Sequence, residues 1–131
     1  METKLNFNSA ICTTREQSER LLALGLKKET ADMFWWDNGY GSCAVISRPA
    51  EKEDGEYGKV IPAWSLHRLI EMIQDVCSRI IMVESWVRIE NRCMPFVDYH
   101  CDSFDNTYDN LCDCIEWLIK GGYFNKEYLE E

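Results

Sequence analysis

Apolar residues recur every three or four positions in several stretches of the chain, which is the spacing of an amphipathic helix. The stretch near the C-terminus is the most complete. Asn106 or Thr107 can cap its start, Asp109 lies in the first turn, and Gly121 with Gly122 can end it. The pattern predicts a long helix that packs on the core, with a stripe of Tyr108, Leu111, Cys112, Ile115, Leu118 and Ile119.

Two earlier stretches show the same helical spacing. Thr14 and Gln17 have the form of a capping box, and the leucine-rich helix that they open is expected to stop at Gly25. The next helix starts either near Pro62, whose fixed φ suits a first turn, or after Ser65 as the N-cap. The apolar stripe of this helix is Leu66, Leu69, Ile70, Ile73, Val76 and Cys77.

The first of two predicted hairpins lies between these helices. Phe34–Trp36 precedes Asn38-Gly39, a pair that is typical of two-residue turns because both positions tolerate positive φ. Residues 43–47 are expected to return as the partner strand, with Gly41 marking a bulge.

The second hairpin follows the middle helix. From Ile80 to Glu90 apolar and polar residues alternate with a period of two, so we expect one strand with Ile81, Val83, Val87 and Ile89 on one face. Residues 93–99 would return beside it, and Pro95 places that strand at a sheet edge because proline has no amide hydrogen to donate.

Together these elements predict an α+β fold with about four antiparallel strands in two hairpins and three to four helices packed mainly on one face. The fourth helix would be a short turn at 28–33. A chain of 131 residues suits a single domain, 1–131. A mobile acidic loop is expected at about 49–60, where charged residues crowd around Gly55 and Gly58.

The charge of the chain limits its partners. Its 23 acidic and 14 basic residues give a formal net charge of -9, which argues against nucleic acid because phosphate binding requires clustered Lys and Arg. Acidity fits solubility or a basic patch on a protein partner. No apolar run is long enough to span a membrane, and no signal-peptide core is found, so we expect a cytoplasmic protein. The seven cysteines are then expected to be reduced and to behave as small hydrophobes.

The densest group of possible metal ligands lies between Asp98 and Asp113. The candidates are His100, Asp102 and Asp109, which would require a cleft that holds the imidazole with two or more carboxylates. The alternative is that these acids are helix-start and surface charges. No paired-ligand spacing and no calcium-loop pattern is found, so no cofactor is expected.

Covalent catalysis has no clear motif in this sequence. His100 precedes Cys101, but neighbours on a strand point to opposite faces, so this imidazole could not activate that thiol. An enzyme is therefore less favoured than a binding protein. The alternative function is a small metal-dependent enzyme or metal-binding protein that uses the Asp98–Asp113 region.

Three tryptophans favour a binding role. Trp117 lies opposite the apolar stripe of the last helix and, with Trp86 and one of Trp35 or Trp36, could form an aromatic contact surface; we take Trp36 as the candidate. The alternative is that another element covers Trp117. We therefore expect a non-enzymatic interaction module that binds a protein partner or a second copy of itself, as in a dimer.

Several segments of the chain carry a resemblance to known sequences: Thr14–Leu22, Thr30–Met33, Pro62–Leu66, Tyr108–Asn110, Glu116–Leu118, Gly122–Tyr123 and Asn125–Leu129. They resemble a family of small uncharacterised proteins encoded by phages, prophages and conjugative elements of gut bacteria. The resemblance implies a mobile-element protein in the cytoplasm of a bacterial host. The family has no known activity, so the resemblance implies no functional residue.

Overall fold

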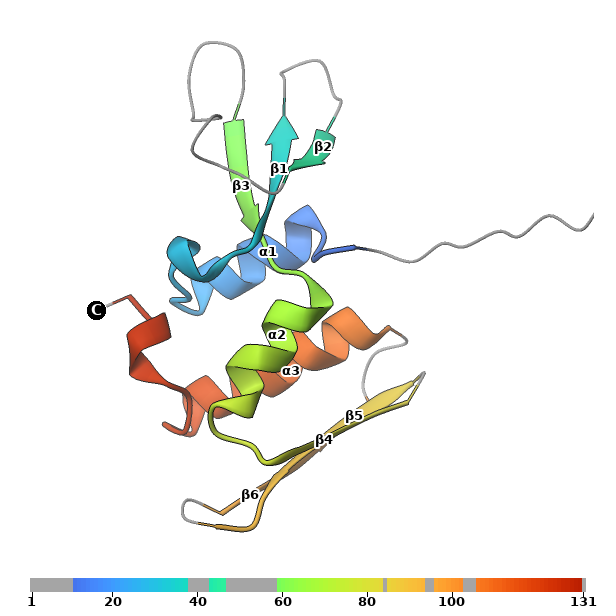
Figure 1. Ribbon diagram of the computed structural model, residues 1–131, viewed down its shortest axis with the longest axis vertical. Helices are drawn as coiled ribbons and strands as arrows, with labels where there is room; N and C mark the ends of the chain where they lie inside the picture. Colours follow the sequence, from blue (N-terminus) through green and yellow to red (C-terminus); the bar gives the residue numbers. More distant parts are fainter. Residues whose placement is uncertain are drawn as a thin grey trace, which may run out of the picture.

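The computed structural model describes residues 11–37, 43–46, 59–83, 85–93, 96–102 and 106–130 (Figure 1). These ranges contain three α-helices and six strands, and the strands form two separate three-stranded antiparallel sheets. The predicted α+β class with antiparallel strands is therefore confirmed. The finer expectation, about four strands with the helices mainly on one face, is met only in part: six strands are described, and the helices contact strands of both sheets.

The three helices begin at caps that the sequence predicted. α1 (Arg15–Ala23) starts after the capping box of Thr14 and Gln17, and α3 (Thr107–Lys120) starts after Asn106. α2 (Leu66–Gln74) uses Ser65 as its N-cap, which decides between the two expected starts. Two short 3-10 turns, η1 (Lys28–Thr30) and η3 (Lys126–Tyr128), complete the helical elements in the described ranges.

The first sheet has the order β2-β1-β3 and contains β1 (Met33–Asp37), β2 (Cys43–Ile46) and β3 (Lys59–Ala63). β1 pairs with β2 as predicted, but Asp37 pairs with Cys43, so five residues separate the strand ends instead of two. β3 is an addition: Pro62 lies in it, opposite Phe34, and not in a helix. Of the predicted acidic loop, residues 59 and 60 belong to β3, and 49–58 lie outside the described residues.

The second sheet has the order β4-β5-β6 and contains β4 (Arg79–Val83), β5 (Trp86–Asn91) and β6 (Val97–Cys101). The expected single strand from Ile80 to Glu90 is thus a hairpin, in which Val83 pairs with Trp86 across a two-residue connection. β6 lies at an edge of this sheet, as Pro95 predicted.

The helices form a layer between the two sheets (Figure 1). α3 contacts β5 and β6, α2 contacts α3 and β4, and α1 contacts α3 and β3. Trp64 is fully buried within this layer, and its indole N–H donates to the hydroxyl of Thr30 over 2.9 Å. No helix in the described ranges is long and apolar enough to cross a membrane.

Candidate interaction surface

The β4–β5–β6 sheet has two unlike faces. Residues paired directly across an antiparallel sheet point to the same face, so the pairings assign every side chain. The inner face, toward α3, receives the rows Ile80–Ile89–Tyr99 and Met82–Val87–Cys101, together with the pair Asn91–Val97. The outer face receives the rows Arg79–Glu90–Asp98 and Ile81–Arg88–His100, together with the pair Val83–Trp86. No described helix lies beneath this outer face (Figure 1).

One end of the outer face is aromatic and aliphatic. The rings of Trp86 and His100 stack with their centroids 4.8 Å apart and an angle of 28° between planes. Val83 remains 44% exposed beside them, and Ile81 is half-buried. Exposed aromatic and aliphatic side chains gathered on one face are the composition that interface cores favour.

The other end of the outer face is a network of ion pairs. Arg88 donates from Nε and one terminal nitrogen to the two carboxylate oxygens of Asp98, over 3.1 and 3.0 Å. The same Nε lies 3.0 Å from Glu90, and Arg79 approaches Glu90 to 3.9 Å. The hydrogen bonds to Asp98 are the main cause that raises the pKa of Arg88 above its ordinary value. The network holds the guanidinium of Arg88 in place over the central strand.

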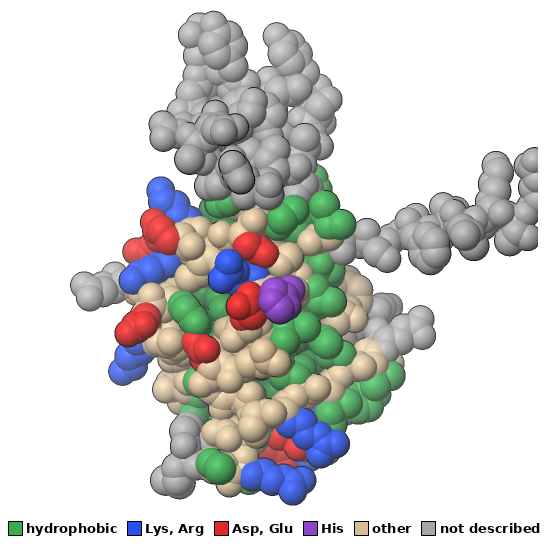
Figure 2. Space-filling model, in the orientation of Figure 1, with side chains coloured by type: hydrophobic (Ala, Val, Ile, Leu, Met, Phe, Trp, Pro, Cys, Tyr) green, Lys and Arg blue, Asp and Glu red, His purple; other side chains and the backbone are tan. Residues whose placement is uncertain are grey.

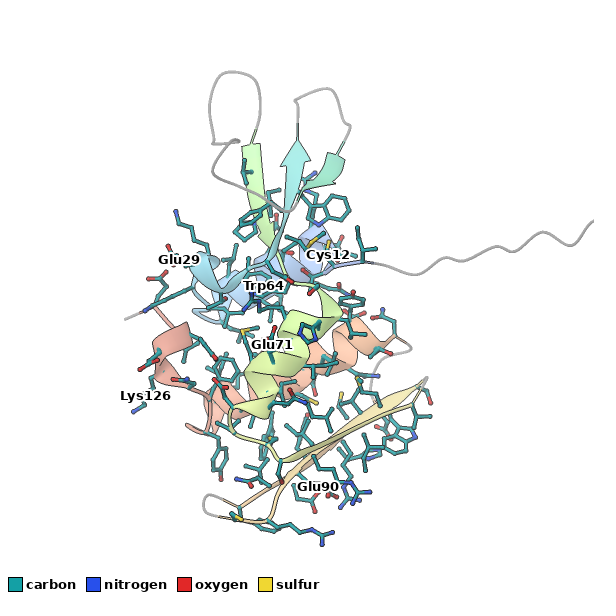
Figure 3. All side chains as sticks on the ribbon, in the orientation of Figure 1. Cys12, Glu29, Trp64, Glu71, Glu90 and Lys126 are labelled. Carbon is teal, nitrogen blue, oxygen red and sulfur yellow. The ribbon has the colours of Figure 1, made fainter. Side chains whose placement is uncertain are left out.

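Glu90 shows how tightly this end is packed. Although it lies on the face that no described helix covers, only 7% of it is exposed, because Arg79 and Arg88 close over it from both sides. Its Oε2 is buried and has no hydrogen-bond partner among the described residues. Figure 3 shows Glu90 on the side of the sheet that faces away from the helices, and Figure 2 shows basic side chains around an acidic one at this position.

The structure distributes the three predicted tryptophans over different parts of the molecule. Trp86 lies on the outer face. Trp117 lies on α3, on the other side of this sheet, and stacks between Tyr99 and Tyr123 with centroids 4.7 and 5.5 Å away. Trp36 belongs to β1 in the first sheet, and its side chain is outside the described residues. Trp86 and Trp117 therefore do not share one surface. The position of Trp117 between two aromatic rings fits the alternative in which another element covers it.

Of the three candidate metal ligands, two lie near each other and the third lies elsewhere. His100 Nε2 lies 3.9 Å from Asp102 Oδ2. Asp109 lies on α3, where it accepts hydrogen bonds from Gln17 over 2.8 Å and from the Asn106 side chain over 2.6 Å. Within the described ranges, no group of three or more His, Cys, Asp or Glu side chains is placed to hold a metal ion.

The two ends of the Asp98–Asp113 region serve different partners. Asp98 is engaged by Arg88 on the outer face. Asp113 accepts a hydrogen bond from the hydroxyl of Tyr99 over 2.5 Å, and its other carboxylate oxygen lies 3.5 Å from the guanidinium of Arg20 on α1. Burial is the main cause that raises the pKa of Tyr99, and the hydrogen bond to Asp113 adds to it. This region therefore supplies packing and ion-pair contacts between elements.

Most cysteines that the structure describes lie in the core. Burial raises the pKa of Cys77 to about 11 and of Cys112 to about 12, so these thiols stay protonated at neutral pH. Cys101 points inward, to a contact of 3.3 Å with Asn110, whereas His100 points outward. A protonated, buried thiol is a poor nucleophile, so the prediction that these residues act as small hydrophobes fits their positions.

A polar hollow of about 420 Å³ lies between α2 and the C-terminal turn. It is lined in part by Glu29, Arg68, Glu71, Asp75 and Tyr128, and Figure 3 labels the first and third of these residues. Arg68 Nε is buried and finds no hydrogen-bond partner in the part of the chain that the structure describes. The described residues that line this hollow include no Cys, Ser or His.

Sequence reasoning identified Trp86 and His100 but not their contact with each other. It also did not foresee that Ile81 and Val83 lie on the same face as Trp86, because it treated β4 and β5 as one strand. The opposite charges of Arg88 and Asp98 were visible in the sequence, and the pairing of β5 with β6 would have predicted their contact. No protein-family model, curated protein or solved structure matches this chain.

Proposed function

We propose that this protein is a non-enzymatic protein–protein interaction module of a phage or other mobile element, acting in the cytoplasm of a bacterial host. The observation that carries the proposal is the outer face of the β4–β5–β6 sheet, where Trp86 stacks on His100 beside the exposed Val83. The origin and the host rest on the resemblance of the sequence segments described above.

The chemistry of this face specifies what it would bind. Ile81, Val83 and Trp86 offer an apolar area for an aliphatic or aromatic side chain of a partner. Arg88 and Asp98 already satisfy each other, so they would form a polar border that contributes specificity more than affinity. The partner we expect is therefore a protein that presents an apolar side chain with hydrogen-bonding groups around it.

The two histidines of the chain allow a matched test by photo-crosslinking. His100 lies in the proposed surface, whereas His67 lies on α2 with 82% of its side chain exposed. A photoreactive phenylalanine at position 100, which keeps an aromatic ring against Trp86, should give one discrete adduct in host or infected-cell lysate. The same group at position 67 should not.

The adduct must also depend on the surface itself. Trp86→Ala in the chain labelled at position 100 removes the apolar side chain on which a partner would pack, and we expect it to lower the yield of the adduct at least about tenfold. Equal adducts from positions 67 and 100, or an adduct that Trp86→Ala leaves unchanged, would contradict the proposed surface.

The second candidate function, a metal-binding protein or small metal-dependent enzyme, is favoured only by the approach of His100 to Asp102. Native mass spectrometry of protein purified without added metal, compared with a denatured spectrum, tests it. We expect the mass of the bare chain. A stoichiometric metal that disappears in His100→Ala and Asp102→Asn, but persists in Asp109→Asn, would favour the metal site instead.

A further inference from the structure

The two edges of the β4–β5–β6 sheet differ in how they are protected. β6 carries Asp98 and His100, and Pro95 precedes it in the sequence, features that discourage pairing with another strand. β4 has the sequence Arg-Ile-Ile-Met-Val, with Arg79 as its one charged residue. Two of its side chains, Met82 and Val83, are 40% and 44% exposed. An apolar strand of this kind at an edge is a template for a further strand.

The backbone groups at this edge follow from the register. Val83 and Trp86 flank a two-residue connection, so they form a hydrogen-bonded pair of the antiparallel ladder. Because such pairs alternate, Ile81 also bonds toward β5, whereas the N–H and C=O groups of Ile80 and Met82 point away from it. Among the described residues no strand pairs with this edge of β4. Two amides and two carbonyls are thus available in a fixed pattern.

We infer that β4 pairs with β4 of a second copy of this chain, antiparallel and centred on Ile81. In this register each Ile80 lies opposite the partner's Met82, and the two residues exchange both hydrogen bonds. The Ile80–Met82 pair occurs twice, once on each side of the symmetry axis. The N–H and C=O groups of Ile80 and Met82 in each copy are therefore all hydrogen-bonded. It is also the antiparallel register in which all five residues of β4 face a residue of the other β4. The two sheets then become one sheet of six strands.

The same register continues the apolar rows of the inner face. Across the dimer, the row Tyr99–Ile89–Ile80 of one copy meets the row Met82–Val87–Cys101 of the other, so Met82 gains an apolar neighbour at its exposed side. On the outer face, the two Ile81 side chains meet at the axis, and each Val83 lies opposite the other copy's Arg79. The register, the hydrogen bonding and the side-chain chemistry therefore all favour pairing centred on Ile81.

The size and charge of the molecule set the strength of this dimer. Stable interfaces bury at least about 1,200 Å² in total, more than two five-residue strands cover, so we expect a concentration-dependent equilibrium between monomer and dimer. Each copy carries a formal net charge of -9, and the two copies repel each other. Salt screens this repulsion, so the dimer should become tighter as ionic strength rises. An interface held by ion pairs would show the opposite salt dependence.

Analytical ultracentrifugation of the full chain over a range of concentration and salt tests the association. Ile81→Lys places two like charges directly opposite each other at the axis, and we expect it to weaken dimer formation by about tenfold or more. His67→Lys, which adds the same charge at an exposed position on α2, should not weaken dimer formation. A chain that stays monomeric at all concentrations and salts would overturn the inference, as would a dimer unaffected by Ile81→Lys.

A disulfide test examines the register independently of any loss of stability. In a background in which the exposed Cys93 is replaced by Ser, Ile81→Cys places two thiols directly opposite each other and should give a covalent dimer under mild oxidation. Val83→Cys places the two thiols about 13 Å apart along the strands, too far to bridge. Cross-linking at position 83 as readily as at position 81, or at neither, would overturn the proposed register.

The dimer uses the backbone edge of β4, whereas the proposed function depends on Trp86 and His100 on β5 and β6. Ile81 and Val83 belong to both surfaces, but the two tests have separate readouts, and either can fail without the other. The photo-crosslinking experiment detects a partner at His100 whether or not β4 pairs. The ultracentrifugation experiment needs no partner other than the chain itself.

Discussion

On the inner face of the β4–β5–β6 sheet, Val87 and Ile89 are fully buried against the helical layer, whereas on the outer face their neighbours Trp86 and Arg88 remain partly in solvent. The two faces are built from the same three strands and differ by one residue along each strand. The inner face satisfies its polar groups by contacts with α3, such as Tyr99 with Asp113. The outer face pairs its charges with one another. The alternation of side chains along each strand therefore places the buried packing on one face and the partly exposed side chains on the other.

The largest expected effect is on the inner face. Ile89→Ala leaves a cavity in a fully buried row and should lower the free energy of unfolding by about 2–5 kcal/mol. Ile81→Ala on the outer face removes the same side-chain atoms from a half-buried site and should cost well under half as much. Urea denaturation of both variants measures the difference. Equal decreases in unfolding free energy would show that the outer face is also covered and would contradict the difference between the two faces.

A second comparison uses the two tryptophans that lie on either side of the sheet. Trp117→Ala removes two stacking contacts, with Tyr99 and Tyr123, and should cost about 2–3 kcal/mol of unfolding free energy. Trp86→Ala removes one stack, with His100, and should cost about 1 kcal/mol. Thermal and urea unfolding give both values. A larger loss for Trp86→Ala would assign it a structural role in place of a contact role.

The thiols of the core predict a loss of stability at high pH. The pKa of Cys112 is raised from 9.0 to about 12 in the folded protein, so above pH 9 the unfolded chain releases a proton that the folded chain retains. The stabilising contribution is therefore complete below pH 9 and is lost as pH rises toward 12. Between pH 8 and pH 10 the loss should be about 1 kcal/mol smaller in Cys112→Ala than in the unchanged chain. An identical pH dependence in both chains would contradict the burial of this thiol as a protonated group.

The smallest effect is expected for the ion pairs of the outer face. Asp98→Asn weakens the double hydrogen bond to Arg88 on an exposed surface, so the decrease in stability should be slight and should vanish as salt is raised. Denaturation at low and high salt, with Asp102→Asn as a control of equal charge change, measures it. A large decrease that persists in high salt would mean that this network is shielded from solvent by a part of the protein that the outer face contacts.

Local sequence signals were sufficient for the helices. Thr14 with Gln17, Ser65 and Asn106 each lie at a helix start because their side chains bond amides within the next turn, an interaction that depends only on near neighbours. Gly25 and Gly122 follow helices with φ of +99° and +77°, where glycine has no steric penalty. These contacts span few residues, so the sequence alone determines them.

The strands could be predicted only in part. Strand periodicity identified the residues of β4 and β5, but the turn between them changes which residues share a face: Val83 pairs with Trp86, although they are an odd number of positions apart. A single strand would have placed these two residues on opposite faces. The prediction that Ile81 and Val83 lie on one face with Val87 and Ile89 is therefore wrong. For the same reason, the sequence pattern did not predict the outer face.

The surface that we propose for recognition was decided by tertiary structure. The sequence by itself determined the α+β class, the helix ends, the acidic charge and the apolar stripes, because these follow from neighbours in the chain. Only the fold decided that Trp117 stacks on Tyr99, that Trp86 stacks on His100, and that β4 forms an edge. Each of these depends on which strand lies next to which, and that choice is made by long-range packing against α3.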